Sequence, residues 1–338
     1  MKDLIDSTQK KIRSFLIGKQ KQEGEKLESR LDKILDKHGV KDEEQRRKCE
    51  EVYELAEYIS GLLRIENLSS LKLKVSYYTK KEVATNLLAL GETGKRGEFR
   101  LYYTSEMNDP SEGKILLNFL EIKNENGSEL PENIPFIACF SLEENSLNQF
   151  RLYGKEGDNE ATGVSIVFRY SFFENYDLYR CVYINHEGKF KVSFSKENEE
   201  KEEVEVDKTQ EGIEEHFDKL KELCKELYGI SKEDIKPKLL VDLLIKIIYL
   251  VKDSAFEEER ECRIVVLKDI KDLKNKKCNL GIDGNRMYII KEDVQEISDH
   301  IEKIYFAPLT EGMETFEIKT NVKCIRSLHP YRGKKPIV

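Results

Sequence analysis

The chain changes character near residue 70, and this change limits the folds open to it. Before that point, apolar residues recur at helical spacing and would share one helix face: Leu27, Leu31, Ile34 and Leu35. Gly39 is placed to end that helix, and Asp42 is placed to cap the next one. We therefore predict a helical hairpin within an N-terminal region of residues 1–68. It would be either an appendage packed on the rest of the chain or a docking surface or inhibitory lid.

After residue 70, short runs rich in Val, Ile, Tyr and Phe are bounded by Gly, Asn, Asp and Ser, which is typical of strands. The predicted strands cover 73–78, 99–104, 136–140, 163–168, 178–184, 189–194, 262–267, 287–290, 316–319 and 322–327. Strands scattered along the chain with helices grouped between them predict an α+β fold. We assign this fold to one domain, residues 69–338.

Three helices are predicted among these strands from the spacing of their apolar residues. The residues expected to face inward are Val83, Ala84, Leu87 and Leu88 in the first helix, Leu147 and Phe150 in the second, and Val294, Ile297, Ile301 and Ile304 in the third. The first would end at Gly91. The second would begin at Ser141, which has capping-box spacing to Glu144, and would stop at Gly154.

A helical insertion is predicted at about residues 208–252. Its first helix would use a face formed by Ile213, Phe217, Leu220 and Leu227. Its second would start at Ser231 and run through the apolar segment 239–251, which is shorter than the about 20 residues of a bilayer span. We therefore expect a buried core helix and no membrane span. The charged segment 196–212 just before the insertion is interpreted as a loop or a solvated hairpin.

Composition narrows the functional classes only a little. The 57 basic and 65 acidic residues give a net charge of −8, which argues against a general nucleic-acid binder but leaves room for a local basic patch. The seven cysteines form no pair or cluster with zinc spacing, and their odd number argues against a disulfide framework. A reducing cytoplasm is the expected location. The five histidines lie far apart in sequence, and each is expected to be structural.

The segment before the strand at 262 holds the most informative charged residues. In an extended strand, Glu259, Glu261 and Arg263 would share one face. Two carboxylates and a guanidinium beside an apolar strand must be solvated, paired or used in chemistry. They are therefore either an Arg–Glu network at a sheet edge or a site that stabilises a cationic transition state. Elsewhere, the turn Asn108-Asp109-Pro110 and the polar side chains around the short helix at 141–154 are weaker candidates.

Several short motifs in order resemble a bacterial family, the domain of unknown function 2971 family. The motifs are Tyr77-Tyr78-Thr79, Asn108-Asp109-Pro110, Cys139-Phe140-Ser141, Gln149-Phe150-Arg151-Leu152-Tyr153 and Glu259-x-Glu261-x-Arg263. The resemblance covers about residues 73–332. Phe150 stands where this family usually has Trp.

A second, weaker resemblance is to the ADP-ribosyltransferase fold, with a split β-sheet core. It implies NAD as substrate and no metal. Glu261 would support an oxocarbenium-like transition state, and Glu259 would orient or deprotonate the acceptor. The implied NAD-binding residues are Tyr77, Tyr78, Thr79, Arg100, Asn108, Ser141, Gln149, Tyr153 and Arg263. Tyr77 occupies a position where such enzymes have His or Arg.

These resemblances imply an ADP-ribosyltransferase-like protein, plausible as a bacterial toxin or phage-defence effector. It would use NAD or a related nucleotide, with a protein or nucleic-acid acceptor that the sequence does not identify. Two alternatives stay open. One is a module of the same fold that binds a nucleotide or a protein without turnover. The other is a partner protein whose N-terminal helices form the working surface. The oligomeric state is likewise open.

Overall fold

The structure is a computed structural model. It describes residues 21–66, 68, 72–90, 97–104, 111–122, 131, 133–155, 159–193, 199–230, 237–275, 279–291 and 296–331. For helical residues 21–28, 199–211 and 230, only the backbone is described.

The predicted N-terminal hairpin is confirmed. Helix α2 covers Lys21–His38 and helix α3 covers Glu43–Leu63. Gly39 between them has a φ of 69°, a left-handed conformation that glycine adopts without steric cost. The side chain of Asp42 caps α3 by accepting a hydrogen bond from the Gln45 amide at 2.9 Å. The turn residues that the sequence singles out therefore set both helix ends.

In the described part of the chain, ten strands form one mostly antiparallel sheet, which confirms a mixed α+β fold. The order along the sheet is β10-β11-β2-β3-β1-β4-β12-β13, and β9 and β5 extend from β3 off this path. A second sheet of three strands has the order β7-β6-β8. The ten strands of the large sheet are β1 (Val75–Thr79), β2 (Arg100–Tyr103), β3 (Asn133–Ser141), β4 (Val164–Phe168), β5 (Leu178–Arg180), β9 (Glu261–Asp269), β10 (Leu280–Asp283), β11 (Arg286–Ile290), β12 (Ile301–Phe306) and β13 (Lys323–Arg326). The small sheet holds β6 (Val182–Ile184), β7 (Phe190–Val192) and β8 (Val251–Asp253).

Strand β3 is where the large sheet divides. Along one side, β9 pairs with it over all of Asn133–Ser141. Along the other side, β2 pairs with Phe136 and Ile137, whereas β1 pairs only at Ser141. Two strands therefore share one edge of β3, and residues 138–140 pair with neither of them.

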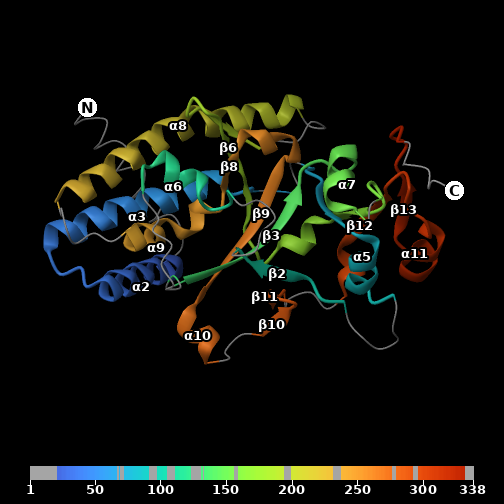
Figure 1. The fold of residues 1–338 in the computed structure, drawn as a ribbon, viewed down its shortest axis with the longest axis horizontal. Coiled ribbons are helices and arrows are strands. Elements are labelled where there is room, and N and C mark those ends of the chain that lie inside the picture. The colour runs from blue at the N-terminus through green and yellow to red at the C-terminus, as the bar shows by residue number, and fades with distance from the viewer. Residues whose placement is uncertain are drawn as a thin grey trace.

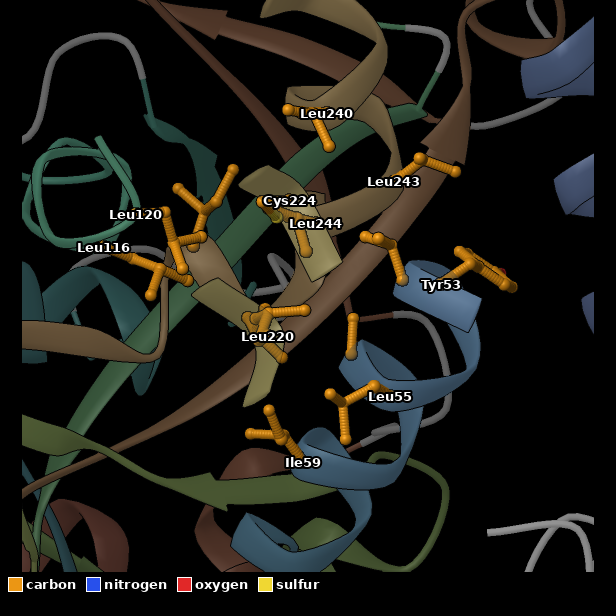
Figure 2. Close-up of a cluster of buried hydrophobic side chains, with 14 of the residues drawn as sticks. Tyr53, Leu55, Ile59, Leu116, Leu120, Leu220, Cys224, Leu240, Leu243 and Leu244 are labelled. Atoms are coloured by element: carbon orange, nitrogen blue, oxygen red, sulfur yellow. The ribbon is translucent and has the colours of Figure 1, made fainter. Parts of the chain in front are cut away.

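A helical core lies on one side of the large sheet and joins segments that are far apart in the sequence. Figure 1 shows α2, α3, α6 (Ile115–Phe119), α8 (Glu199–Ile230) and α9 (Pro237–Ile248) gathered there. In Figure 2, side chains of α3, α6, α8 and α9 point toward one another; they include Leu55, Ile59, Leu116, Leu220 and Leu244. The predicted face of α8 is buried in this core, and so is most of α9. How the chain divides into domains stays a prediction.

A second core, rich in phenylalanine, lies against the other face of the sheet. Phe99, Phe140, Phe168 and Phe172 stack or meet edge to face, with ring centroids 4.0–6.3 Å apart. Helices α5 (Lys81–Leu87) and α11 (Met313–Thr320) contribute to it through Leu87 and Phe316. A smaller cluster around Tyr78 and Phe150 lies beneath α7 (Leu147–Tyr153).

Several sequence-based predictions are wrong in detail. Residues 301–306 form strand β12 and not part of a helix, because a bulge between Ile301 and Lys303 lets Ile301, Ile304 and Phe306 all face the core. The apolar spacing of three therefore imitates a helix. The segment 316–319 lies in α11, with Phe316 buried and Ile318 83% exposed.

Three local predictions also need correction. Residues 199–212 belong to α8, because their glutamates and lysines are good helix formers and lead directly into its amphipathic part. Helix α7 starts after Ser146, whereas Ser141 ends β3. Val83 is exposed on α5, although Ala84 and Leu87 are buried as expected. None of the helices in the described part of the chain has the length and apolar character needed to cross a membrane.

Gly163 offers a test of close packing at the start of β4. A Cβ atom at this position would lie 2.4 Å from the Thr79 carbonyl oxygen and 2.5 Å from the Gly154 Cα. We expect Gly163→Ala to lower the unfolding free energy by about 1–3 kcal/mol, because backbone atoms must move apart. The matched control is Gly229→Ala in α8, where nothing lies within 4 Å and alanine should stabilise the helix by about 0.5–1 kcal/mol. Urea unfolding of both variants measures this, and equal effects would contradict it.

Candidate functional site

A left-handed residue brings the two predicted acids together. The 3-10 helix η4 (Ser254–Glu259) ends at Arg260, whose φ of 45° and ψ of 48° are unusual for a residue with a side chain. Strand β9 begins at the next residue, Glu261. The guanidinium of Arg260 pairs with Glu143 at 3.1 Å, and its carbonyl accepts from the Leu142 amide at 2.9 Å. These contacts hold the turn that separates Glu259 from Glu261.

Lys252 lies between the two carboxylates. It belongs to β8, and its Nζ is 2.5 Å from Glu259 Oε2 and 2.5 Å from Glu261 Oε2. All three residues are buried, with 4%, 6% and 4% of Lys252, Glu259 and Glu261 exposed. One buried ammonium therefore binds both acids. Lys252 was not among the predicted site residues. The sequence signal for it is its position directly after the buried apolar segment 239–251.

Arg263 on β9 completes the charge network. Its Nε donates to Glu261 Oε1 at 2.6 Å and its Nη2 to Glu261 Oε2 at 3.0 Å. Its Nη1 donates to Glu112 and to the Tyr249 carbonyl. The side chain is fully buried. Glu261 is thus held by a two-pronged guanidinium contact as well as by Lys252, a geometry that strongly favours the ionised carboxylate.

Hydroxyl groups of three residues hydrogen-bond to Glu259 and Glu261. Tyr153 on α7 donates to Glu259 Oε1 at 2.7 Å, and Ser141 donates to the Glu259 carbonyl at 2.8 Å. Tyr183 on β6 accepts from the Glu261 amide at 2.8 Å. Because Tyr153 is 36% exposed while Glu259 is nearly covered, the tyrosine forms the outer wall of the site next to this carboxylate.

The surroundings push the pKa values of the two acids in opposite directions. Burial raises the pKa of Glu259, and Lys252 offsets this only in part. Burial acts in the same sense on Glu261, but Arg263 and Lys252 together hold its pKa well below its usual range. When two neighbouring carboxyl groups have well-separated pKa values, one can hold a proton while the other is ionised. The arrangement suits acid–base chemistry at Glu259.

The structure brings some of the predicted site residues together and leaves others apart. Glu259, Glu261, Arg263, Ser141 and Tyr153 meet in this network. Of the other predicted residues, Tyr78 donates its hydroxyl to the Glu143 carbonyl on the α7 side of the sheet. Thr79 and Gln149 are buried, but within the described residues neither side chain forms a hydrogen bond to the network.

Tyr77 lies where β1 and β2 diverge along β3. Its ring packs on Phe99 and Phe140, with centroids 5.3 and 6.0 Å away. Burial, with smaller effects from Tyr102 and Cys139, raises the pKa of its hydroxyl to about 12. Cys139 is the register partner of Arg263, so Tyr77 approaches the acid network across this residue.

Two predicted residues lie away from the network or beyond the description. Arg100 is a half-buried residue at the start of β2 and pairs with Asp283 at 3.0 Å. Asn108 lies outside the described residues. Among the described residues, no group of three or more His, Cys, Asp and Glu side chains could hold a metal ion.

Comparison with known proteins gives one match. Residues 149–264 match the family model described as "Protein of unknown function (DUF2971)". The DUF2971 segment runs from α7 into β9, so it contains Tyr153, Lys252, Glu259, Glu261 and Arg263. No curated protein and no solved structure matches the chain.

Proposed function

We propose that the chain is an NAD-dependent ADP-ribosyltransferase that works through Glu259. The observation that carries this proposal is the pair of carboxylates bound by one buried lysine, with pKa values pushed in opposite directions. Glu261 is fully engaged by Arg263 and Lys252, so it acts as a positioning residue. Glu259 borders the exposed Tyr153 and is the acid that substrate can approach.

The proposed reaction breaks the glycosidic bond between ribose C1′ and the nicotinamide nitrogen. The bonding electrons leave with nicotinamide, and positive charge develops on the ribose. Negative charge fixed in a site of low polarity stabilises such a transition state. The acceptor then forms a bond to C1′ and gives its proton to Glu259, whose raised pKa favours proton uptake.

The division of the sheet at β3 supports the same proposal. Strands β1 and β2 share one edge of β3, and the acid network lies on the strand that pairs along the opposite edge. We take this as an ADP-ribosyltransferase-like split sheet, in which nucleotide would lie beside Tyr77 and Cys139. The setting of a bacterial toxin or phage-defence effector rests on the family resemblance, and the acceptor is a protein or a nucleic acid.

Substitution of Glu259 tests the proposal. We expect Glu259→Gln to reduce nicotinamide release from NAD by about 10²–10³-fold, because the amide can neither take the proton nor supply charge. The control is Glu258→Gln, since Glu258 is exposed and bonds only to Asn148 in the described part of the chain. Chromatography of nicotinamide measures the rate. Equal rates for Glu259→Gln and the wild type would exclude this role.

A second candidate function is a nucleotide-binding module without turnover. The observation that favours it is the near-complete pairing of the acids, because Lys252 and Arg263 already supply counter-charges to Glu259 and Glu261. Calorimetric titration with NAD and ADP-ribose separates the two candidates. Binding without nicotinamide release favours this module, and binding with release favours the transferase.

A further inference from the structure

Two arginines and two tyrosines alternate on one face of the large sheet, at the end away from the helical core. Tyr102 of β2 pairs in register with Tyr288 of β11, so their side chains lie on the same face, with ring centroids 5.8 Å apart. The Arg286 guanidinium lies over the Tyr102 ring, 4.4 Å from its centroid, and the Arg100 guanidinium lies over the Tyr288 ring at 4.3 Å. We call these four residues the Arg–Tyr face. Stacking on the rings fixes both guanidinium planes before any ligand arrives.

The neighbouring strand is built to admit this arrangement. Gly281 of β10 is the register partner of Tyr288, and a Cβ atom at Gly281 would lie 2.2 Å from Tyr288 Cζ. The tyrosine ring therefore lies flat across the glycine. A larger residue at 281 would displace the ring on which Arg100 rests.

Asp283 shows that the Arg–Tyr face can hold an oxyanion. Arg100 Nη1 and the Tyr102 hydroxyl both donate to the same oxygen, Asp283 Oδ2, at 3.0 and 3.2 Å. Two donors thus converge on one oxyanion. Asp283 sits next to the hairpin turn and is 54% exposed, so a ligand oxyanion could replace it. Within the described part of the chain, no carboxylate forms an ion pair with Arg286.

The Arg–Tyr face continues toward the acid network. Tyr102 is the register partner of Ile137 on β3, two residues before Cys139. Cys139 is in turn the partner of Arg263 on β9. From β9 to β11 there are three strand spacings, or about 14 Å. Tyr77 lies between the Arg–Tyr face and the acid network. Its hydroxyl interacts electrostatically with both Cys139 and Arg286.

We propose that the Arg–Tyr face binds a nucleoside diphosphate group, with the phosphates on Arg286, Arg100 and the Tyr102 hydroxyl and the base against a guanidinium plane. Guanidinium forks match phosphate oxygens, and their flat faces stack on aromatic rings. Asp283 occupies part of this site and competes with the ligand. The identity of the ligand as a nucleotide rests on the proposed function.

Calorimetric titration of the full chain with ADP tests the proposal, with inorganic diphosphate as a second ligand. We expect Arg286→Met to weaken ADP binding by about 10–100-fold, because one charged hydrogen-bonding group is lost. Asp283→Asn should strengthen binding several-fold, since a competing negative charge is removed. A purely structural role of the Arg–Tyr face predicts no gain in this second variant. Tighter binding of ADP than of diphosphate supports base stacking, and equal binding overturns that part.

The outcomes also separate this proposal from the proposed function. If Arg286→Met and Asp283→Asn both bind ADP like the wild type, the Arg–Tyr face is not the site, whether or not nicotinamide is released. If ADP binding changes as expected but no variant releases nicotinamide, the site stands and the transferase proposal fails.

Discussion

Lys252→Met is expected to lower the unfolding free energy by about 3–5 kcal/mol at neutral pH. The substitution leaves two buried carboxylates close together, with Arg263 as the only remaining cation in contact with either of them among the described residues. Burial of an uncompensated charge is among the largest penalties that a single substitution can cause. A methionine side chain has nearly the length of lysine, so loss of packing contributes little.

The loss should depend on pH in a definite direction. Burial raises the pKa of Glu259 in the folded protein, so the folded state binds more protons than the unfolded state just above the ordinary carboxyl pKa. Stability from this group therefore decreases as pH rises through that window. Without Lys252 the pKa of Glu259 should increase further, and the lowered pKa of Glu261 should rise toward its usual range. The deficit of Lys252→Met should then be smaller at pH 5 than at pH 8.

Urea unfolding at the two pH values measures this difference. Lys191→Met is the matched control, because Lys191 forms an exposed ion pair with Glu257 near the same 3-10 helix. Exposed pairs of this kind contribute about 0–1 kcal/mol. A deficit of Lys252→Met that is no larger than that of the control, or that is equal at both pH values, would contradict the buried network.

Arg263→Met should be at least as destabilising, at about 3–5 kcal/mol or more. Removal of this guanidinium leaves Glu261, Glu112 and the Tyr249 carbonyl without their shared donor. Arg263→Lys keeps the charge but cannot make the two-pronged contact with Glu261, so its stability should lie between those of Arg263→Met and the wild type.

The control for this series is Arg46→Met, which breaks an exposed ion pair with Asp32 on the N-terminal hairpin. It should cost less than about 1 kcal/mol. Thermal unfolding by circular dichroism ranks the variants. If Arg263→Lys were as stable as the wild type, the two-pronged contact would have no energetic weight. If Arg46→Met matched Arg263→Met, burial would not be the cause.

Local chemistry made much of the fold predictable. Asp42 and Gly39 mark the ends of the first two helices, and the β-branched and aromatic runs mark β1 to β4. Prediction failed where a long-range contact overrides a local pattern. The bulge in β12 gives the buried residues of this strand a spacing of three, which resembles a helix. Pairing with β4 and β13 decides its conformation.

The candidate site was predictable in part for the same reason. The spacing of Glu261 and Arg263 along one strand predicts their contact, and the structure confirms it. The predicted strand position of Glu259 is wrong, because this residue ends the 3-10 helix η4 and meets Lys252 across the left-handed turn at Arg260. Their counter-charge comes from Lys252 on the small sheet, and Glu112 comes from a segment before α6. Only the packing of two sheets and a helix puts these residues side by side, so no local pattern reveals them.

The helical core has a consequence for how the chain is made. Helix α3 buries Val52, Leu55 and Ile59 against α8 and α9, which lie far later in the sequence. A ribosome adds about 5–20 residues per second. The apolar face of α3 therefore stays exposed for many seconds before α8 and α9 are synthesised. Truncations that end before α8 should therefore aggregate.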